Sequence, residues 1–180
     1  MDLVQQITQL ELTDELHEAR LLVLLSAFCG EQAGSLEGLT KLAKLDFLLR
    51  YPVWLERALK AKGQSVANLA IADAERSSVE SQMVRYRFGP WDHRYRRWLN
   101  DLAAKGLVVV GARGKAVTID LTDAGRVLAE KIAATPEFEL TAKRSRVLRS
   151  YFDLRATNLM RFIYDTVPEI ASLRMNEKIG

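Results

Sequence analysis

The stretch WLNDLAAKGLVVVGARGKAVTIDLTDAGRVLAE, residues 98–130, changes from a helical pattern to a strand pattern and back again. Gly106 ends the helical part, and the runs LVVV and AVTIDL then flank the short loop GARGK. Runs rich in β-branched residues on either side of a glycine-containing loop are typical of a β-hairpin. Thr122 follows the second run and is suited to cap the N-terminus of a closing helix. The stretch therefore predicts a helix, a two-stranded hairpin over 107–121 and a second helix.

The helix before the hairpin carries one apolar face that includes three aromatic rings. Gly89 and Pro90 predict a turn that leads into this helix. Five apolar residues then follow at spacings of four, three, one and three: Trp91, Tyr95, Trp98, Leu99 and Leu102. Residues at these spacings lie on one side of a helix. We therefore expect the rings to lie in the core, and stacking of exposed rings on nucleic-acid bases is the alternative.

The rest of the chain is mostly helical in pattern. Apolar periodicity and proline or glycine breaks predict helices over 12–28, 36–50, 53–61, 141–151 and 156–167, a polar connection over 64–81 and a short strand over 83–88. The first of these helices is so densely apolar that it must be buried on most sides. Pro136 marks a boundary, so we divide the chain into a domain over 1–135 that contains the hairpin and a C-terminal helical extension over 136–180.

In this order the elements resemble a winged-helix domain with additional N- and C-terminal helices. The resemblance rests on residues 98–130, which are similar to the helix, wing and following helix of many winged-helix proteins. It implies a mostly α fold with a small β-hairpin and a winged helix-turn-helix core. Because one fold hosts many tasks, function has to be argued from a site.

A narrower resemblance rests on three blocks: KLAKLDFLLRYPVWLERAL (41–59), VESQMVRYRFGPWDHRYRRWLNDLAAKGLV (79–108) and NLMRFIYDTVPEI (158–170). In this order they resemble the middle component of ABC-three-component bacterial conflict systems, which include Lamassu-type antiphage systems. The resemblance implies an accessory subunit without an active site of its own. Its partners would be an SMC-like ABC ATPase and an effector such as a nuclease.

Positive charge is concentrated around the predicted helix and wing. The whole chain carries a net charge of +3, whereas eight basic and two acidic residues give the segment 83–115 a net charge of +6. Such asymmetry indicates a polyanion or an acidic protein surface as a partner. The candidate nucleic-acid-binding residues are Arg94, Arg96 and Arg97 on the helix and Arg113 and Lys115 at the wing tip. Contact with DNA, contact with a protein and simple solvation all stay open, and five phosphate contacts would give a logarithmic salt slope of about −4 to −5.

No arrangement of residues predicts catalysis. GARGK lacks the spacing of a phosphate-binding loop, and no helix begins directly after it. Asp92 and His93 are adjacent, but no nucleophile is arranged around them, and Asp92 is better suited to cap or charge the first turn of the helix. Cys29 is the single cysteine and is expected in the core. With only two histidines besides it, the chain has too few sulfur and nitrogen ligands for a structural zinc site. We therefore expect no enzyme activity, no metal and no other cofactor.

The C-terminal helical pattern has an apolar face of its own. Its residues are the candidate partner interface: Leu159, Phe162, Ile163, Tyr164 and Val167. Such a face has to be covered by the chain's own domain, by a second copy or by a partner subunit. All three stay open.

Length and composition bound the class of protein. The chain has 180 residues, of which 48% are hydrophobic and 27% charged, so it can bury one sizeable core. No apolar run approaches the roughly 20 residues of a membrane span, and the first residues do not have the pattern of a signal peptide. We expect a cytoplasmic protein without a membrane partner.

The resemblance of the three blocks, taken with the +6 segment, implies a non-enzymatic winged-helix adaptor subunit of an SMC-like ABC ATPase defence complex against phage or plasmid DNA. It would bridge the ATPase and the effector, and double-stranded DNA is left open as a third partner. The alternative is a stand-alone winged-helix transcriptional regulator that binds DNA as a homodimer.

Overall fold

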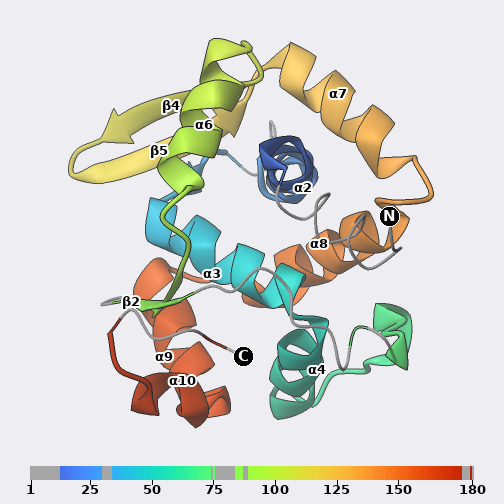
Figure 1. Ribbon diagram of the computed structural model, residues 1–180, viewed down its shortest axis with the longest axis vertical. Helices are drawn as coiled ribbons and strands as arrows, with labels where there is room; N and C mark the ends of the chain where they lie inside the picture. The colour runs from blue at the N-terminus through green and yellow to red at the C-terminus, as the bar shows by residue number, and fades with distance from the viewer. Residues whose placement is uncertain are drawn as a thin grey trace, which may run out of the picture.

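The computed structural model describes residues 13–29, 34–73, 75, 84–86, 89–175 and 179, and in these residues it combines helices with two small antiparallel sheets. In chain order the elements are α2 (Asp14–Phe28), β1 (Leu36–Glu37), α3 (Leu39–Arg50), α4 (Pro52–Ala61), the 3₁₀ turn η1 (Ala67–Leu69), β2 (Val84–Tyr86), β3 (Gly89–Trp91), α6 (Tyr95–Ala104), β4 (Val108–Arg113), β5 (Ala116–Leu121), α7 (Asp123–Ala133), α8 (Glu139–Phe152), α9 (Ala156–Thr166) and α10 (Pro168–Ser172). The fold is thus mostly helical, with a three-stranded sheet that includes a β-hairpin (Figure 1).

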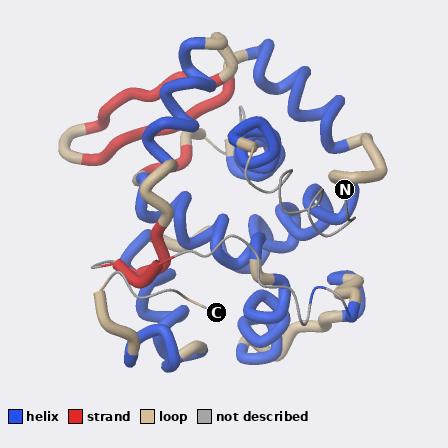
Figure 2. Tube along the Cα trace, viewed as in Figure 1, coloured by secondary structure: helices blue, strands red, loops and turns tan. Residues whose placement is uncertain are grey.

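The predicted hairpin is confirmed. β4 and β5 pair from Val108 opposite Leu121 to Arg113 opposite Ala116, and a two-residue turn at Gly114 and Lys115 joins them. Gly114 has φ +61°, a backbone conformation that glycine adopts without strain. Figure 2 shows the hairpin extending away from the helices.

Thr122 caps the following helix as expected, because its Oγ1 accepts a hydrogen bond of 3.0 Å from the backbone N–H of Gly125. Gly125 also lies against the start of the hairpin. A Cβ added to it would stand 1.9 Å from the carbonyl oxygen of Leu107. Only glycine therefore allows α7 to approach the base of the hairpin this closely.

The expected start of the helix over 36–50 is wrong. Leu36 and Glu37, expected in a helix over 36–50, form β1, which pairs with β5. Gly38 separates β1 from α3: its φ of +95° turns the chain, and its N–H donates to the carbonyl oxygen of Val117 at 2.7 Å. A helical pattern in leucines does not reveal such a two-residue strand, because its pairing partner lies some 80 residues away in the sequence.

The segment before α6 is also different from the expectation. Gly89 and Pro90 lie in β3, which pairs with β2, instead of forming a turn into a helix. Trp91 ends β3, and α6 begins only at Tyr95. The strand expected over 83–88 corresponds to β2, with residues 83, 87 and 88 outside the described part of the chain, as are residues 74 and 76–81 of the polar connection.

α2 lies at the centre of the molecule, as its apolar density predicts. Figure 1 shows it end-on, with α3, α6, α7 and α8 around it. Its residues 21–25 are all at most 2% exposed. The same hydrophobic core contains residues from before and after Pro136, including Trp98 of α6 and Leu148 of α8. None of the described helices combines the length and the apolar character needed to cross a membrane.

Candidate functional site

The aromatic residues of α6 belong to the core, as expected. Tyr95 and Trp98 are 0% exposed, and Leu99 and Leu102 are at most 4% exposed. The two rings meet edge-on, with centroids 5.4 Å apart. Trp91 is half-buried on β3 and meets Tyr95 at 5.6 Å. Because Tyr95 and Trp98 are enclosed, they have no free face on which a nucleic-acid base could stack.

A buried charge network fixes the position of α6. The carboxylate of Asp46 on α3 is 0% exposed and accepts hydrogen bonds from Arg20 Nε at 2.7 Å and from the Tyr95 hydroxyl at 2.6 Å. Burial raises the pKa of Asp46, but the guanidiniums of Arg20 and Arg50 outweigh it, so that the pKa lies below its usual value. The paired, charged carboxylate therefore ties α6 to α2 and α3.

His17 of α2 extends this network. Its ring stacks on Trp98 at 4.5 Å, and Arg20 Nη1 donates to His17 Nδ1 at 2.7 Å. Burial and the neighbouring Arg20 lower the pKa of His17 to about 3. Because Nδ1 accepts this hydrogen bond, His17 is neutral and carries its proton on Nε2.

Asp92 does not cap the helix as expected, because it lies three residues before Tyr95 and α6 has no side-chain cap. Its Oδ1 accepts from the backbone N–H of Arg94 at 3.0 Å, and its Oδ2 accepts from Arg94 Nη2 at 2.8 Å and from Arg50 Nη1 at 3.1 Å. Burial raises the pKa of Asp92, but the hydrogen bonds from Arg94 and the charge of Arg50 outweigh it and hold the pKa well below its usual range. The guanidinium of Arg94 also lies over the Trp98 ring at 4.8 Å. Arg94 is thus engaged within the fold.

The other four candidate cations lie on the surface. Arg97 pairs with Asp14 at 2.5 Å, and Arg113 pairs with Glu37 at 2.8 Å. Ion pairs this exposed are worth about 0–1 kcal/mol, so an external anion can replace the partner. Arg96 and Lys115 are exposed and have no ion-pair partner among the residues that the structure describes.

The five cations have different surroundings. Arg96 lines a groove between α6, β3 and the hairpin, and Arg113 and Lys115 line a depression that includes residues 34–41. The two hollows adjoin, because Leu39, Thr40 and Val117 line both.

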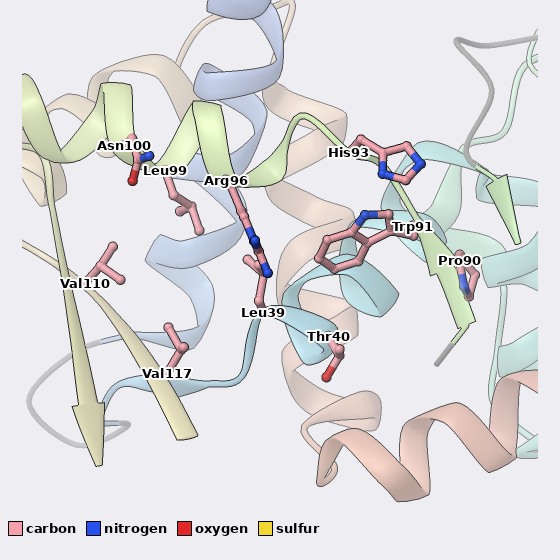
Figure 3. A pocket seen from close by; sticks show the side chains of 10 residues that line it. All are labelled: Leu39, Thr40, Pro90, Trp91, His93, Arg96, Leu99, Asn100, Val110 and Val117. Atoms are coloured by element: carbon pink, nitrogen blue, oxygen red, sulfur yellow. The ribbon is translucent and has the colours of Figure 1, made fainter. Parts of the chain in front are cut away.

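The groove beside Arg96 has a volume of about 720 Å³ and is mainly apolar. Figure 3 shows its lining residues, which are Leu39, Thr40, Pro90, Trp91, His93, Arg96, Leu99, Asn100, Val110 and Val117. The Arg96 side chain extends from α6 toward Leu39, with Trp91 on one side and Val117 on the other (Figure 3). Among the described residues, the lining contains one guanidinium and no carboxylate.

The valines of the groove continue the core side of the sheet. Val110 is paired with Ile119, which is 0% exposed, and residues paired across an antiparallel ladder share a face. Val117, two residues before Ile119, is on the same face. Val110 is nevertheless 44% exposed and Val117 40% exposed, because the hairpin extends past the helices that cover its base.

The remaining candidates have structural surroundings. GARGK forms the end of the hairpin. Cys29 is 6% exposed, its Sγ lies 3.4 Å from the carbonyl oxygen of Ile119, and burial raises the pKa of its thiol to about 11. His93 is exposed and lines the groove. Within the described ranges no group of three or more His, Cys, Asp or Glu residues is placed to hold a metal ion.

The apolar face of α9 is covered by the chain itself. Leu159, Ile163 and Val167 are at most 1% exposed, and Phe162 and Tyr164 are half-buried. α9 packs on α3, α4, β3 and α10. Of the three coverings that the sequence left open, the first therefore applies in this structure, and we place no partner on this face.

The sequence did not reveal the network around Asp46. Asp46 and Arg50 lie in the otherwise apolar run LDFLLR, and charges within such a run are buried only when they are paired. Two charged residues within an apolar run were therefore the one sequence signal of a buried ion-pair network. Their partners, Tyr95 and Asp92, lie more than 40 residues further along the chain.

Comparison with protein-family models, with curated proteins and with solved structures finds no match to this chain.

Proposed function

We propose that this chain is a non-enzymatic winged-helix adaptor subunit that holds larger proteins together. The order of elements supports the winged-helix assignment: α2, β1 and α3 are followed by α6 and by the hairpin of β4 and β5. The sheet order β1-β5-β4 is the one in which a wing hairpin pairs with the first strand of such a domain. α4, η1 and the β2–β3 ribbon are then an insertion between the second helix and α6.

The main support for a docking role is the outer half of the hairpin, which the helices leave exposed. Val110 and Val117 are 44% and 40% exposed, and both line the apolar groove beside α6. Clustered exposed apolar residues beside a groove are typical of a surface that binds another protein. A surface that only follows a phosphate backbone needs cations instead.

The setting that the sequence resemblance suggests is a defence complex built on an SMC-like ABC ATPase with an effector subunit such as a nuclease. In that setting this chain contributes binding surfaces and the other subunits contribute chemistry. Contact with DNA is an additional role that Arg96 and Lys115 support, because both are exposed without an ion-pair partner among the described residues.

Co-expression with the products of the flanking genes, followed by size exclusion, tests the proposal. We expect the chain to co-elute with an ATPase encoded beside it. A chain that elutes alone, with no ATPase gene in the neighbourhood, contradicts the adaptor role.

Salt dependence of DNA binding separates the adaptor from a regulator. Arg96 and Lys115 can meet phosphates without losing an ion-pair partner among the described residues, and Arg97 and Arg113 can exchange theirs, so the logarithmic slope is expected between about −2 and −3.5, compared with about −4 to −5 for all five candidate cations. Binding to one duplex about 10³-fold tighter than to competitor DNA would instead favour a stand-alone transcriptional regulator.

A further inference from the structure

β4 lies at the edge of its sheet, and the register determines which of its backbone groups face outward. The order is β1-β5-β4, so one side of β4 is paired and the other is not. The carbonyl oxygen of Leu107 accepts from the N–H of Thr122 at 3.1 Å. In an antiparallel ladder the hydrogen-bonded pairs alternate, so the backbone groups of Val109 and Gly111 face β5. Those of Val110 and Ala112 face away from it.

These outward groups lack partners. Within the described ranges, no hydrogen bond from another residue reaches the outward N–H and C=O of Val110 or Ala112. The residues of β4 after Val108 are all exposed, and the hairpin extends beyond the helices (Figures 1 and 2). Natural sheets usually protect such an edge with proline, charge or a bulge, but β4 has the sequence VVVGAR and carries its only charge at its end.

We propose that β4 accepts an extended segment of a partner protein as a fourth strand of the sheet. This proposal rests on the docking role proposed above and specifies how the partner is held. Alternate backbone groups of the added strand would pair with Val110 and Ala112, because strand addition uses the main chain for affinity and alternate side chains for specificity. The side chains on one face of that strand then lie beside Val110 and the groove.

The lining of the groove indicates the chemistry of the segment. Val110, Val117 and Trp91 favour apolar side chains at alternate positions. Arg96 favours a carboxylate among them, since none of the lining residues that the structure describes is acidic. A second copy of β4 does not fit this requirement. Residues 107–117 contain no acid, so a second copy of β4 would offer Arg96 no carboxylate.

Selection of peptides on the full chain tests the proposal. The immobilised protein is screened against displayed random peptides of about 12 residues. We expect the enriched peptides to alternate apolar residues with others and to carry Asp or Glu. Amide hydrogen exchange by NMR should then show at least tenfold protection of the Val110 and Ala112 amides on binding, while the Val109 and Gly111 amides are already slow in the free chain.

Ala112→Pro and Val109→Thr form the matched pair of variants. Proline at residue 112 removes only an outward N–H, which edge strands tolerate, and is expected to weaken peptide binding at least tenfold. Val109→Thr changes a side chain on the opposite face and leaves the edge intact, so binding should change less than twofold. Equal thermal unfolding of both variants and the parent chain shows that any loss arises at the edge.

Three outcomes overturn strand addition: no enrichment of peptides, enrichment of peptides with helical spacing whose binding survives Ala112→Pro, or a dimer of the chain alone that Ala112→Pro dissociates. The co-expression experiment tests the adaptor role separately from strand addition, so either proposal can fail while the other holds. A partner that co-elutes without protecting Val110 and Ala112 leaves the adaptor role in place and rejects strand addition, whereas peptide binding without an ATPase partner has the opposite meaning.

Discussion

The two sides of α6 differ in how their polar and apolar groups are satisfied. On the side toward α2 and α3, charges are buried in pairs: Asp46 with Arg20, and Asp92 with Arg50 and Arg94. On the side toward the outer hairpin, apolar groups are exposed, and Val110 and Val117 lie uncovered beside Arg96. Residue type alone would have assigned the arginines to binding and the valines to the core.

This difference shows that whether a side chain already has a partner inside the protein indicates its role better than its charge does. A buried charge that is paired inside the protein holds the fold and is not free for a ligand. An exposed valine on the core face of a sheet can still gain free energy by burial. Substitutions on each side of α6 test this difference, because their effects on stability should differ.

The largest effect is expected from removing the central carboxylate. Asp46→Ala leaves Arg20 and the Tyr95 hydroxyl without their partner inside the protein, and should lower the free energy of unfolding by about 3–5 kcal/mol. Urea denaturation measures this loss. Glu37→Gln, which removes the exposed partner of Arg113 on the hairpin side, should change stability by less than about 0.5 kcal/mol. Similar losses of unfolding free energy in the two variants would contradict the difference between the two sides of α6.

The base of the hairpin should be nearly as sensitive. Gly125→Ala places a Cβ 1.9 Å from the carbonyl oxygen of Leu107, so α7 or the hairpin has to shift. We expect a loss of about 3 kcal/mol, at the upper end of overpacking effects. Thermal unfolding measures it, with Gly114→Asn at the hairpin turn as a control that introduces no such clash. An unchanged melting temperature for Gly125→Ala would contradict the close packing.

A pH effect of intermediate size is expected from His17. Its folded pKa of about 3 lies below the unfolded value of 6.5, so the unfolded chain binds the proton first as the pH falls. The stability that depends on neutral His17 is therefore fully present above pH 6.5 and is lost progressively toward pH 3. At pH 5 the loss amounts to about 2 kcal/mol. Urea midpoints of the parent chain should fall more between pH 7.5 and pH 5 than those of His17→Gln, and parallel curves would reject the buried neutral state.

The smallest effect on stability is expected at the outer hairpin. Val110→Thr combined with Val117→Thr replaces two methyl groups that are already in contact with solvent, so the free energy of unfolding should change by less than about 0.5 kcal/mol. The same pair of substitutions should weaken partner binding. A loss of several kcal/mol in the isolated chain would mean that these valines support the fold and are not a free surface.

The features that local pattern determines were predictable. The hairpin, the Thr122 cap, the buried face of α6 and the central position of α2 follow from periodicity and capping chemistry over short stretches. Features that depend on distant residues were not. β1 needs β5, Asp46 needs Tyr95, and the coverage of α9 needs α3 and α4, and none of these pairings leaves a local signal.

The candidate site divides in the same way. Spacing predicted one helix for Arg94, Arg96 and Arg97, but α6 begins at Tyr95 and Arg94 precedes it. Which arginine is free depends on Asp92 and on Asp14, which belongs to α2. The exposure of Val110 and Val117 depends on how far the hairpin extends beyond its covering helices. Neither property is contained in the residue types.

The central claim is that the outer hairpin is the docking surface. Co-elution with the proposed ATPase partner tests this claim most directly when two valine variants are compared. Val117→Asp places a charge in the groove, whereas Val127→Asp places the same charge on α7, where the valine is 52% exposed. We predict that the parent chain and Val127→Asp co-elute with the ATPase and that Val117→Asp elutes alone. Co-elution of Val117→Asp at the level of the parent chain, or loss of co-elution in both variants, would contradict the account.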